Sequence, residues 1–269
     1  MKKNFLFVAA LVLAAGSLAS CGDASSAETT TSANATSSTV ATVEGTASAY
    51  GIVNTVCVSQ TTIVVENSKT TSVSIDETFT PSDWASISST EVEGQTVDVI
   101  AYSYDNWGQT YNVEMAKYIK VGDKVFTGTK LSEMDANSQW VVYSNDEISN
   151  LFTYITENLE WYFNQVKEGN ISIVADAEGT AFDTPYTLGS ITEATTNFKA
   201  DAENTYWSGW KENIAKIEAA LTGLNLSTKP VVTQDDGTGE FSFGGVATGS
   251  TMNETESYVD QAVAAWATL

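Results

Sequence analysis

The most informative segment of the chain is Phe241-Ser-Phe-Gly-Gly-Val-Ala-Thr-Gly-Ser-Thr-Met-Asn-Glu-Thr-Glu256. Its alternating phenylalanines predict a strand, and the paired glycines that follow predict a tight turn. Asn253, with Glu256 three residues later, has the form of a helix N-cap and its reciprocal acid. A helix is expected next, because apolar residues then recur on one face. These residues are Tyr258, Val259, Ala262, Val263 and Trp266.

Between the turn and the helix lies a corner that is rich in hydroxyl groups and hinged by a glycine. It consists of Thr248, Gly249, Ser250 and Thr251. Unpaired backbone N–H groups at the start of a helix, together with the positive end of the helix dipole, attract anions. We therefore expect this corner to be suited to holding a phosphate group.

The same four residues, followed by a short amphipathic helix, resemble the flavin attachment motif of FMN-binding domains. In that family the pattern is roughly Asp-x-x-Ser/Thr-Gly-Ala-Thr/Ser, and a dedicated flavin transferase esterifies the phosphate of FMN to the last hydroxyl. The resemblance implies covalent FMN on Thr251, with Thr248, Gly249 and Ser250 beside it. The motif is degenerate, since Gly245 stands in place of the Asp and Ser250 in place of the Ala. The alternative is a turn of small residues without a ligand.

A second stretch, residues 67–84, is similar to the opening of the same family. A polar turn leads into a strand that ends in an acid at Glu77, and a segment carrying Pro81 follows. The order also agrees with that family, because the meander comes first and the hydroxyl motif last. The resemblance implies an α+β fold in which an antiparallel meander packs against two or three helices. Residues 46–269 would form one FMN-binding-like domain with a long insertion around residues 100–230.

The first twenty residues have the organisation of a bacterial lipoprotein signal peptide. Lys2 and Lys3 form a charged region, an apolar run follows, and Leu-Ala-Ser precedes Cys21. The apolar run is too short for a permanent membrane span. We expect residues 1–20 to be removed and Cys21 to carry lipid, with ordinary secretory cleavage as the alternative. Residues 21–45, largely Ala, Ser and Thr, are expected to be a flexible tether.

Charge and composition exclude several classes of function. The 12 basic residues are all Lys, there is no His, and 34 residues are acidic, so the net charge is −22; loss of Lys2 and Lys3 with the signal peptide makes it −24. Nucleic acid is excluded as a partner because phosphate contacts need clustered basic side chains. Without His, and with Cys57 as the only other cysteine, we expect neither a zinc or copper site nor a nucleophile–His relay. Cys57 lies in an apolar run and is expected to be buried.

Elsewhere the apolar pattern alternates between the periods of strands and helices. One helix is predicted over residues 148–166, stopped by Gly169, and another over residues 204–222, closed by Gly223. The predicted strands cover residues 51–58, 61–65, 71–77, 96–102, 110–115, 117–121, 124–126, 140–143, 171–175 and 241–243. Polar or glycine-containing turns at 67–69, 105–108 and 122–123 predict hairpins.

The resemblance to FMN-binding domains, together with the signal peptide, implies a membrane-anchored FMN carrier on the extracytoplasmic face of the cell membrane. A flavin transferase would load it, a membrane redox partner would reduce it, and it would turn over no substrate of its own. Trp84, Trp107, Trp207 and Trp210 are candidates for stacking on the flavin ring, and core packing also explains each of them. The alternative function is that of a non-redox surface lipoprotein that binds a carbohydrate or a partner protein through exposed aromatic residues.

Overall fold

A computed structural model describes residues 42–54, 57–87, 90–92, 94–106, 108–185 and 208–269. The chain divides into two units, residues 1–40 and 41–269, and every described residue belongs to the second. The predicted signal peptide, Cys21 and most of the predicted tether therefore lie outside the described residues, as do Trp107 and Trp207. The described part of the second unit contains antiparallel sheets and five helices, which is an α+β fold. None of these helices is both long and apolar enough to cross a membrane.

The first sheet is a meander of three long antiparallel strands. These are β1 (Gly45–Val53), β2 (Cys57–Glu66) and β3 (Lys69–Phe79). Asn67 and Ser68 join the last two strands, and both have a positive φ, as a tight hairpin turn of the favoured twist requires. The hairpin predicted here is confirmed, and alternate residues in the middle of β3 are buried, as its period-two pattern predicts.

The single strand predicted over residues 51–58 is wrong. β1 ends at Val53, β2 begins at Cys57, and these two residues face each other in the register of the pair. The chain reverses between them, where Asn54 has a positive φ of 53°. Asparagine adopts this conformation more readily than most residues do. Apolar residues on both sides of the turn gave the pattern of one continuous strand. Cys57 is buried, as predicted.

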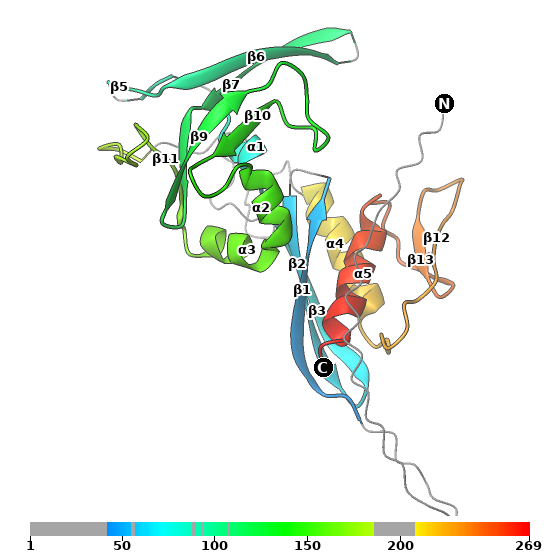
Figure 1. The fold of residues 1–269 in the computed structure, drawn as a ribbon. Helices are drawn as coiled ribbons and strands as arrows, with labels where there is room; N and C mark the ends of the chain where they lie inside the picture. Colours follow the sequence, from blue (N-terminus) through cyan, green and yellow to red (C-terminus); the bar gives the residue numbers. More distant parts are fainter. Residues whose placement is uncertain (1–41, 55–56, 88–89, 93, 107, 186–207) are drawn as a thin grey trace, which may run out of the picture. The chain divides into compact units, whose positions relative to one another are not determined.

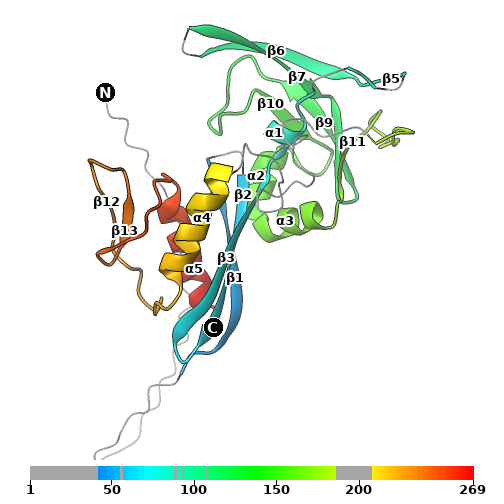
Figure 2. The same ribbon diagram turned by 180° about the vertical axis from the view of Figure 1, so that it is seen from behind.

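Two helices cover this sheet (Figure 1 and, from behind, Figure 2). α5 (Thr255–Trp266) packs on β1 and β2, and α4 (Ser208–Leu221) packs on β3. The predicted apolar face of α5 is confirmed, since four of its five residues are buried and Val263 is partly buried. The helix predicted over residues 204–222 is confirmed over its described part, where the side chains of Ile214, Ile217 and Leu221 are buried.

Polar contacts that are buried for α5 and partly buried for α4 hold both helices in place. On α5, Gln261 accepts hydrogen bonds from the hydroxyls of Ser59 (3.1 Å) and Thr61 (3.2 Å) of β2. On α4, the carboxylate of Glu218 accepts a hydrogen bond from the N–H of Ile75 in β3 (2.8 Å). Partial burial raises the pKa of Glu218, and the hydrogen bond from Ile75 opposes that rise. Each helix is therefore positioned by polar as well as apolar contacts.

A second antiparallel sheet has the strand order β10-β9-β8-β11. Its strands are β8 (Tyr118–Val121), β9 (Lys124–Lys130), β10 (Val141–Ser144) and β11 (Ile171–Ile173). The predicted hairpin at residues 122–123 and the strands predicted in this region are confirmed, with bounds that differ by a few residues.

A long hairpin lies over this second sheet (Figure 1). It consists of β6 (Val99–Asn106) and β7 (Gln109–Ala116), and their pairing confirms the hairpin predicted at residues 105–108. β6 approaches β9 closely at Gly128, where an added Cβ would lie 2.6 Å from Ile100 Cδ1 and 3.0 Å from Tyr143 Cε1. Only glycine leaves room for this approach without a shift of the neighbouring side chains.

The helix predicted over residues 148–166 is two helices. α2 (Leu151–Glu157) and α3 (Leu159–Lys167) are separated at Asn158, whose φ of −136° and ψ of 50° are not helical. The Asn158 side chain donates to the carbonyl of Tyr154 (2.9 Å). An asparagine side chain competes with the helical backbone for hydrogen bonds in this way. The helical spacing of the apolar residues continues across the break, so the spacing did not predict it. α3 contacts β1 and β2 and so shares the core of the first sheet.

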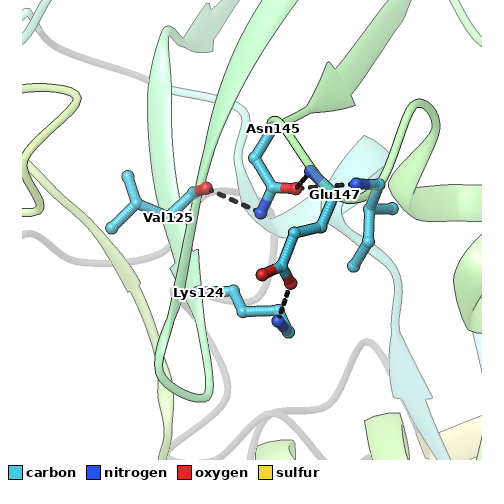
Figure 3. Close-up of polar contacts among 5 residues, drawn as sticks. Lys124, Val125, Asn145 and Glu147 are labelled. Carbon is cyan, nitrogen blue, oxygen red and sulfur yellow. Dashed lines mark hydrogen bonds and ion pairs between the residues drawn. The ribbon is translucent and has the colours of Figure 1, made fainter.

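A polar turn ties the connection between β10 and α2 to β9 (Figure 3). The Asn145 side-chain oxygen accepts from the N–H groups of Glu147 (3.0 Å) and Ile148 (2.8 Å). Its amide group donates to the carbonyl of Val125 (3.2 Å). Glu147 forms an ion pair with Lys124, at the start of β9. Side chains thus hold this connection against the sheet without regular secondary structure.

The remaining described elements are short. They are α1 (Pro81–Trp84), β4 (Glu91–Val92), β5 (Gln95–Thr96), β12 (Val232–Gln234), β13 (Phe241–Phe243) and β14 (Val246–Ala247). β13 is the strand predicted in the segment that leads to α5, and it is the central strand of a small sheet with β12 and β14.

Candidate functional site

The corner predicted to hold a phosphate lies between β14 and α5, and its four residues differ in exposure. Ser250 is fully buried, Thr248 and Gly249 are partly buried, and Thr251 is exposed. Gly249 has a positive φ of 75°, which suits glycine and agrees with its predicted place at the hinge. A protein that approaches from solvent can therefore reach Thr251, but not Ser250.

The backbone N–H groups of this corner are engaged within the protein. The N–H of Thr248 donates to a carbonyl of β13 (2.9 Å), and that of Ser250 donates to the Thr248 hydroxyl (2.9 Å). The N–H of Thr251 donates to the side-chain oxygen of Asn213 (3.1 Å). The expectation that unpaired N–H groups would hold a phosphate is therefore wrong for these three residues. A backbone carbonyl accepts the first of these N–H groups, and short polar side chains accept the other two.

The capping pair predicted at the start of the last helix is also wrong. The N-cap residue of α5 is Glu254 rather than Asn253, and no side chain caps the first turn. Glu256 forms an ion pair with Lys229 (2.8 Å), so its carboxylate points to a partner outside the helix. Within the first turn, the hydroxyl of Thr255 donates to a backbone carbonyl of the preceding loop.

α4 forms the other side of the corner. Besides the contact of Asn213 with Thr251, the alkyl chain of Lys216 runs beside Gly249, where an added Cβ would lie 3.6 Å from Lys216 Cδ. Lys216 is exposed. A flexible cation therefore stands beside the corner and attracts negative charge placed there, although solvent weakens the attraction. The residues present suit an anionic group that is held by the hydroxyl of Thr251.

A second candidate site lies between the β6–β7 hairpin and the loop that precedes β10. Four aromatic rings gather there: Tyr102, Tyr104 and Tyr111 of the hairpin, and Trp140 of the loop. We call these four residues the aromatic array. Neighbouring ring centroids are 5.3–6.4 Å apart, and the angles between the ring planes are only 16–29°. Burial, and to a lesser degree the neighbouring Tyr104, raise the pKa of Tyr102, so its hydroxyl stays protonated near neutral pH.

Tyr102, Tyr104 and Trp140 of the array, but not Tyr111, line a cavity of about 980 Å³, which is at the upper end of the size range of ligand pockets. Polar residues share the lining with the rings, among them Asn106 and Gln139. Asp105 and Thr110 also border the cavity, and their side chains hydrogen-bond to each other (2.6 Å) on the face of the hairpin opposite to Tyr102 and Tyr104. No lysine belongs to the lining, and neither do residues 248–251. The cavity is therefore a site distinct from the corner.

The tryptophans proposed for flavin stacking do not form this array. Trp84 is fully buried, and its indole N–H donates to the hydroxyl of Tyr162 (2.8 Å), so its alternative assignment to the core is confirmed. Trp210 is partly buried and packs against the core. Trp107 and Trp207 lie outside the described residues.

Sequence reasoning missed the array, although part of its signal was present. Tyr102 and Tyr104 are two residues apart on one predicted strand, and Tyr104 faces Tyr111 across the predicted hairpin. These three could have been placed on one face. Trp140 could not, because nothing local brings it to the hairpin.

Among the described residues, no acidic or cysteine side chains gather in a group that could hold a metal ion. No protein-family model matches the chain, and neither a curated protein nor a solved structure is significantly similar to it. The corner and the cavity are therefore the features on which a functional proposal rests.

Proposed function

We propose that the protein is a membrane-anchored, extracytoplasmic electron carrier of the FMN-binding kind, with FMN held as an ester on Thr251. The observation that carries the proposal is the exposure of Thr251 at the end of the degenerate motif. The other two hydroxyl groups of the motif are poor attachment points for the flavin phosphate. Ser250 is buried, and Thr248 donates to a carbonyl of β13 and accepts from the N–H of Ser250.

An ester suits this corner better than a reversible phosphate site does. Three of its N–H groups already have acceptors in the protein, so they do not form a cradle for a free phosphate. An ester needs only the hydroxyl, and Lys216 adds a positive charge beside the corner. We therefore expect the protein without attached flavin to bind added FMN weakly.

In this arrangement the flavin and the polypeptide have separate roles. Attached FMN supplies the electron transfer, while the polypeptide determines where the flavin is held and which charges surround it. The proposal includes a flavin transferase that loads Thr251 and a membrane redox partner that reduces the carrier. The chain itself is proposed to be no catalyst. Lipid on Cys21 would keep the carrier at the membrane.

The test is flavin fluorescence after denaturing electrophoresis of the full-length protein co-expressed with a flavin transferase. The wild type should give a fluorescent band, and Thr251→Ala should abolish it. Thr251→Ser keeps a hydroxyl and should keep the fluorescence. Ser250→Ala removes the buried neighbouring hydroxyl and should also keep it, because that oxygen is not accessible.

Two results would contradict the proposal in different ways. Fluorescence that persists in Thr251→Ala would show that another residue holds the flavin. A dark wild-type band beside a fluorescent control substrate of the same transferase would remove the redox function. The alternative of a non-redox surface lipoprotein would then stand, and the aromatic array is the observation that favours it.

A further inference from the structure

We propose that the cavity beside the aromatic array binds a neutral carbohydrate chain. The cavity lies between the β6–β7 hairpin and residues 131–140, and it shares no lining residue with the corner at 248–251. Binding there does not depend on FMN, so the two proposals can fail separately.

The orientation of the rings favours a ligand that lies on the array. Planes that differ by at most 29°, with centroids 5.3–6.4 Å apart, leave no gap wide enough for another ring to enter between them. A cage for a quaternary ammonium ion needs rings that surround the cation, which near-parallel rings do not. A pyranose ring has an apolar face of C–H groups that can lie against aromatic surface, with its hydroxyls directed outward.

The polar lining supplies partners for those hydroxyls. Asn106 lies two residues beyond Tyr104 and so on the same face of the hairpin as the rings, and Gln139 directly precedes Trp140. The side-chain amides of Asn106 and Gln139 both donate and accept hydrogen bonds. A site of aromatic surface with a few placed polar groups is the usual composition of a small-molecule pocket.

Charge decides between a neutral and an anionic ligand. The lining contains Asp105 and no lysine, and the whole chain has a net charge of −22. Phosphates, sulfates and uronic acids would enter a negative potential. No lining residue is a cation, and Lys130, outside the lining, donates to the carbonyl of Ala101 (3.4 Å). The volume of about 980 Å³ also exceeds what one sugar needs. A chain of several neutral hexose units therefore fits the site best.

The test is isothermal titration calorimetry of the full chain without flavin, with cellohexaose, maltohexaose, laminarihexaose and mannohexaose as neutral probes and sialyllactose as the anionic probe. At least one hexaose should bind saturably, and its monosaccharide and sialyllactose should bind more weakly. Trp140→Ala and Tyr104→Ala should each weaken that binding by about tenfold or more, as truncation of a central aromatic contact does. Tyr118→Ala, which removes a half-buried tyrosine outside the lining, should leave it unchanged.

Three outcomes would overturn the proposal. One is the absence of binding by all four hexaoses at millimolar concentration. Another is binding that Trp140→Ala and Tyr104→Ala leave intact while circular dichroism shows them folded. The third is stronger binding of sialyllactose than of any neutral probe. Thr251→Ala should bind the hexaose as the wild type does, whatever the fluorescence test shows, because residue 251 is not part of the lining.

Discussion

At the scale of single residues, the buried contact between Tyr258 and Glu77 is a strong constraint on how α5 meets the first sheet. Both side chains are buried, and the tyrosine hydroxyl donates to a carboxyl oxygen of Glu77. A buried carboxyl group destabilises the fold unless hydrogen bonds compensate for lost water. Burial, followed by the charge of Glu77, raises the pKa of Tyr258 above its ordinary value of 10.0, so the hydroxyl remains a donor at physiological pH.

Removal of this hydroxyl should therefore destabilise the protein. Tyr258→Phe is expected to lower the free energy of unfolding by about 1.5–3 kcal/mol, the range for hydrogen bonds to charged groups. Urea denaturation at pH 7, followed by tryptophan fluorescence, measures the change. Tyr143→Phe is the matched control, because that buried tyrosine donates to the neutral carbonyl of Ala116 (2.6 Å) and should lose only about 0.5–1.5 kcal/mol. Equal losses in the two variants would contradict a special role for the Glu77 carboxyl.

At the scale of elements, the aromatic array exists because a hairpin is pressed onto the second sheet. β6 meets β9 at Gly128, and the same strand carries Tyr102 and Tyr104 further along. The ring of Tyr143 borders the contact and is held by its hydrogen bond to Ala116, so it has little freedom to move aside. The position of the array thus depends on a residue that is not part of it.

An added methyl group at this contact should disturb both stability and the array. In Gly128→Ala, the new Cβ would lie 2.6 Å from Ile100 Cδ1 and 3.0 Å from Tyr143 Cε1, and overpacking of this kind usually costs about 1–3 kcal/mol. The same variant should weaken binding of the hexaose, since Ile100, the residue that is displaced, lies on the strand that carries Tyr102 and Tyr104. Urea denaturation and calorimetry measure the two effects.

Gly209→Ala is the control for this substitution. Gly209 is helical, and nothing lies within 4 Å of an added Cβ, so the change should be neutral or stabilise by up to about 1 kcal/mol. If Gly128→Ala changes the free energy of unfolding as little as Gly209→Ala does, the contact between β6 and β9 tolerates a larger residue and the prediction is wrong.

At the scale of the whole molecule, the proposed carrier joins an acidic domain to a lipid anchor. The net charge of −22 keeps copies of the protein apart and disfavours contact with anionic surfaces. Retention at a membrane must then come from elsewhere, and the acyl chains proposed on Cys21 supply it, since each buried methylene contributes about 0.8 kcal/mol.

Loss of the anchor should release the protein without affecting flavin loading. In bacterial cells that express the full chain and a flavin transferase, Cys21→Ser should move the protein from the membrane to the soluble fraction. The fluorescent band should persist. Cys57→Ala changes the only other cysteine, which is buried in the core, and should leave the protein at the membrane. Cys21→Ser protein that remains with carbonate-washed membranes would show that lipid on this residue is not what holds it.

Much of the local structure was predictable from the sequence, because it depends on neighbours along the chain. Apolar residues at helical spacing predicted the buried face of α5, and the polar residues at 67–69 predicted the hairpin between β2 and β3. The wrong predictions of one strand and one helix also had local causes. Asn54 and Asn158 interrupt apolar runs whose period is otherwise unbroken, so a strand and a helix were predicted where the chain turns.

The candidate sites needed more than the local pattern. From the chain alone one can predict that a hydroxyl stands at position 251 just before a helix, and that three tyrosines lie on one hairpin. The folded structure was needed to show that the side chain of Asn213 accepts from the N–H of Thr251, that Lys229 pairs with Glu256, and that Trp140 lies beside the tyrosines. Periodicity follows from the geometry of one backbone segment. The partner of a donor, a charge or a ring depends instead on which distant segments packing brings together.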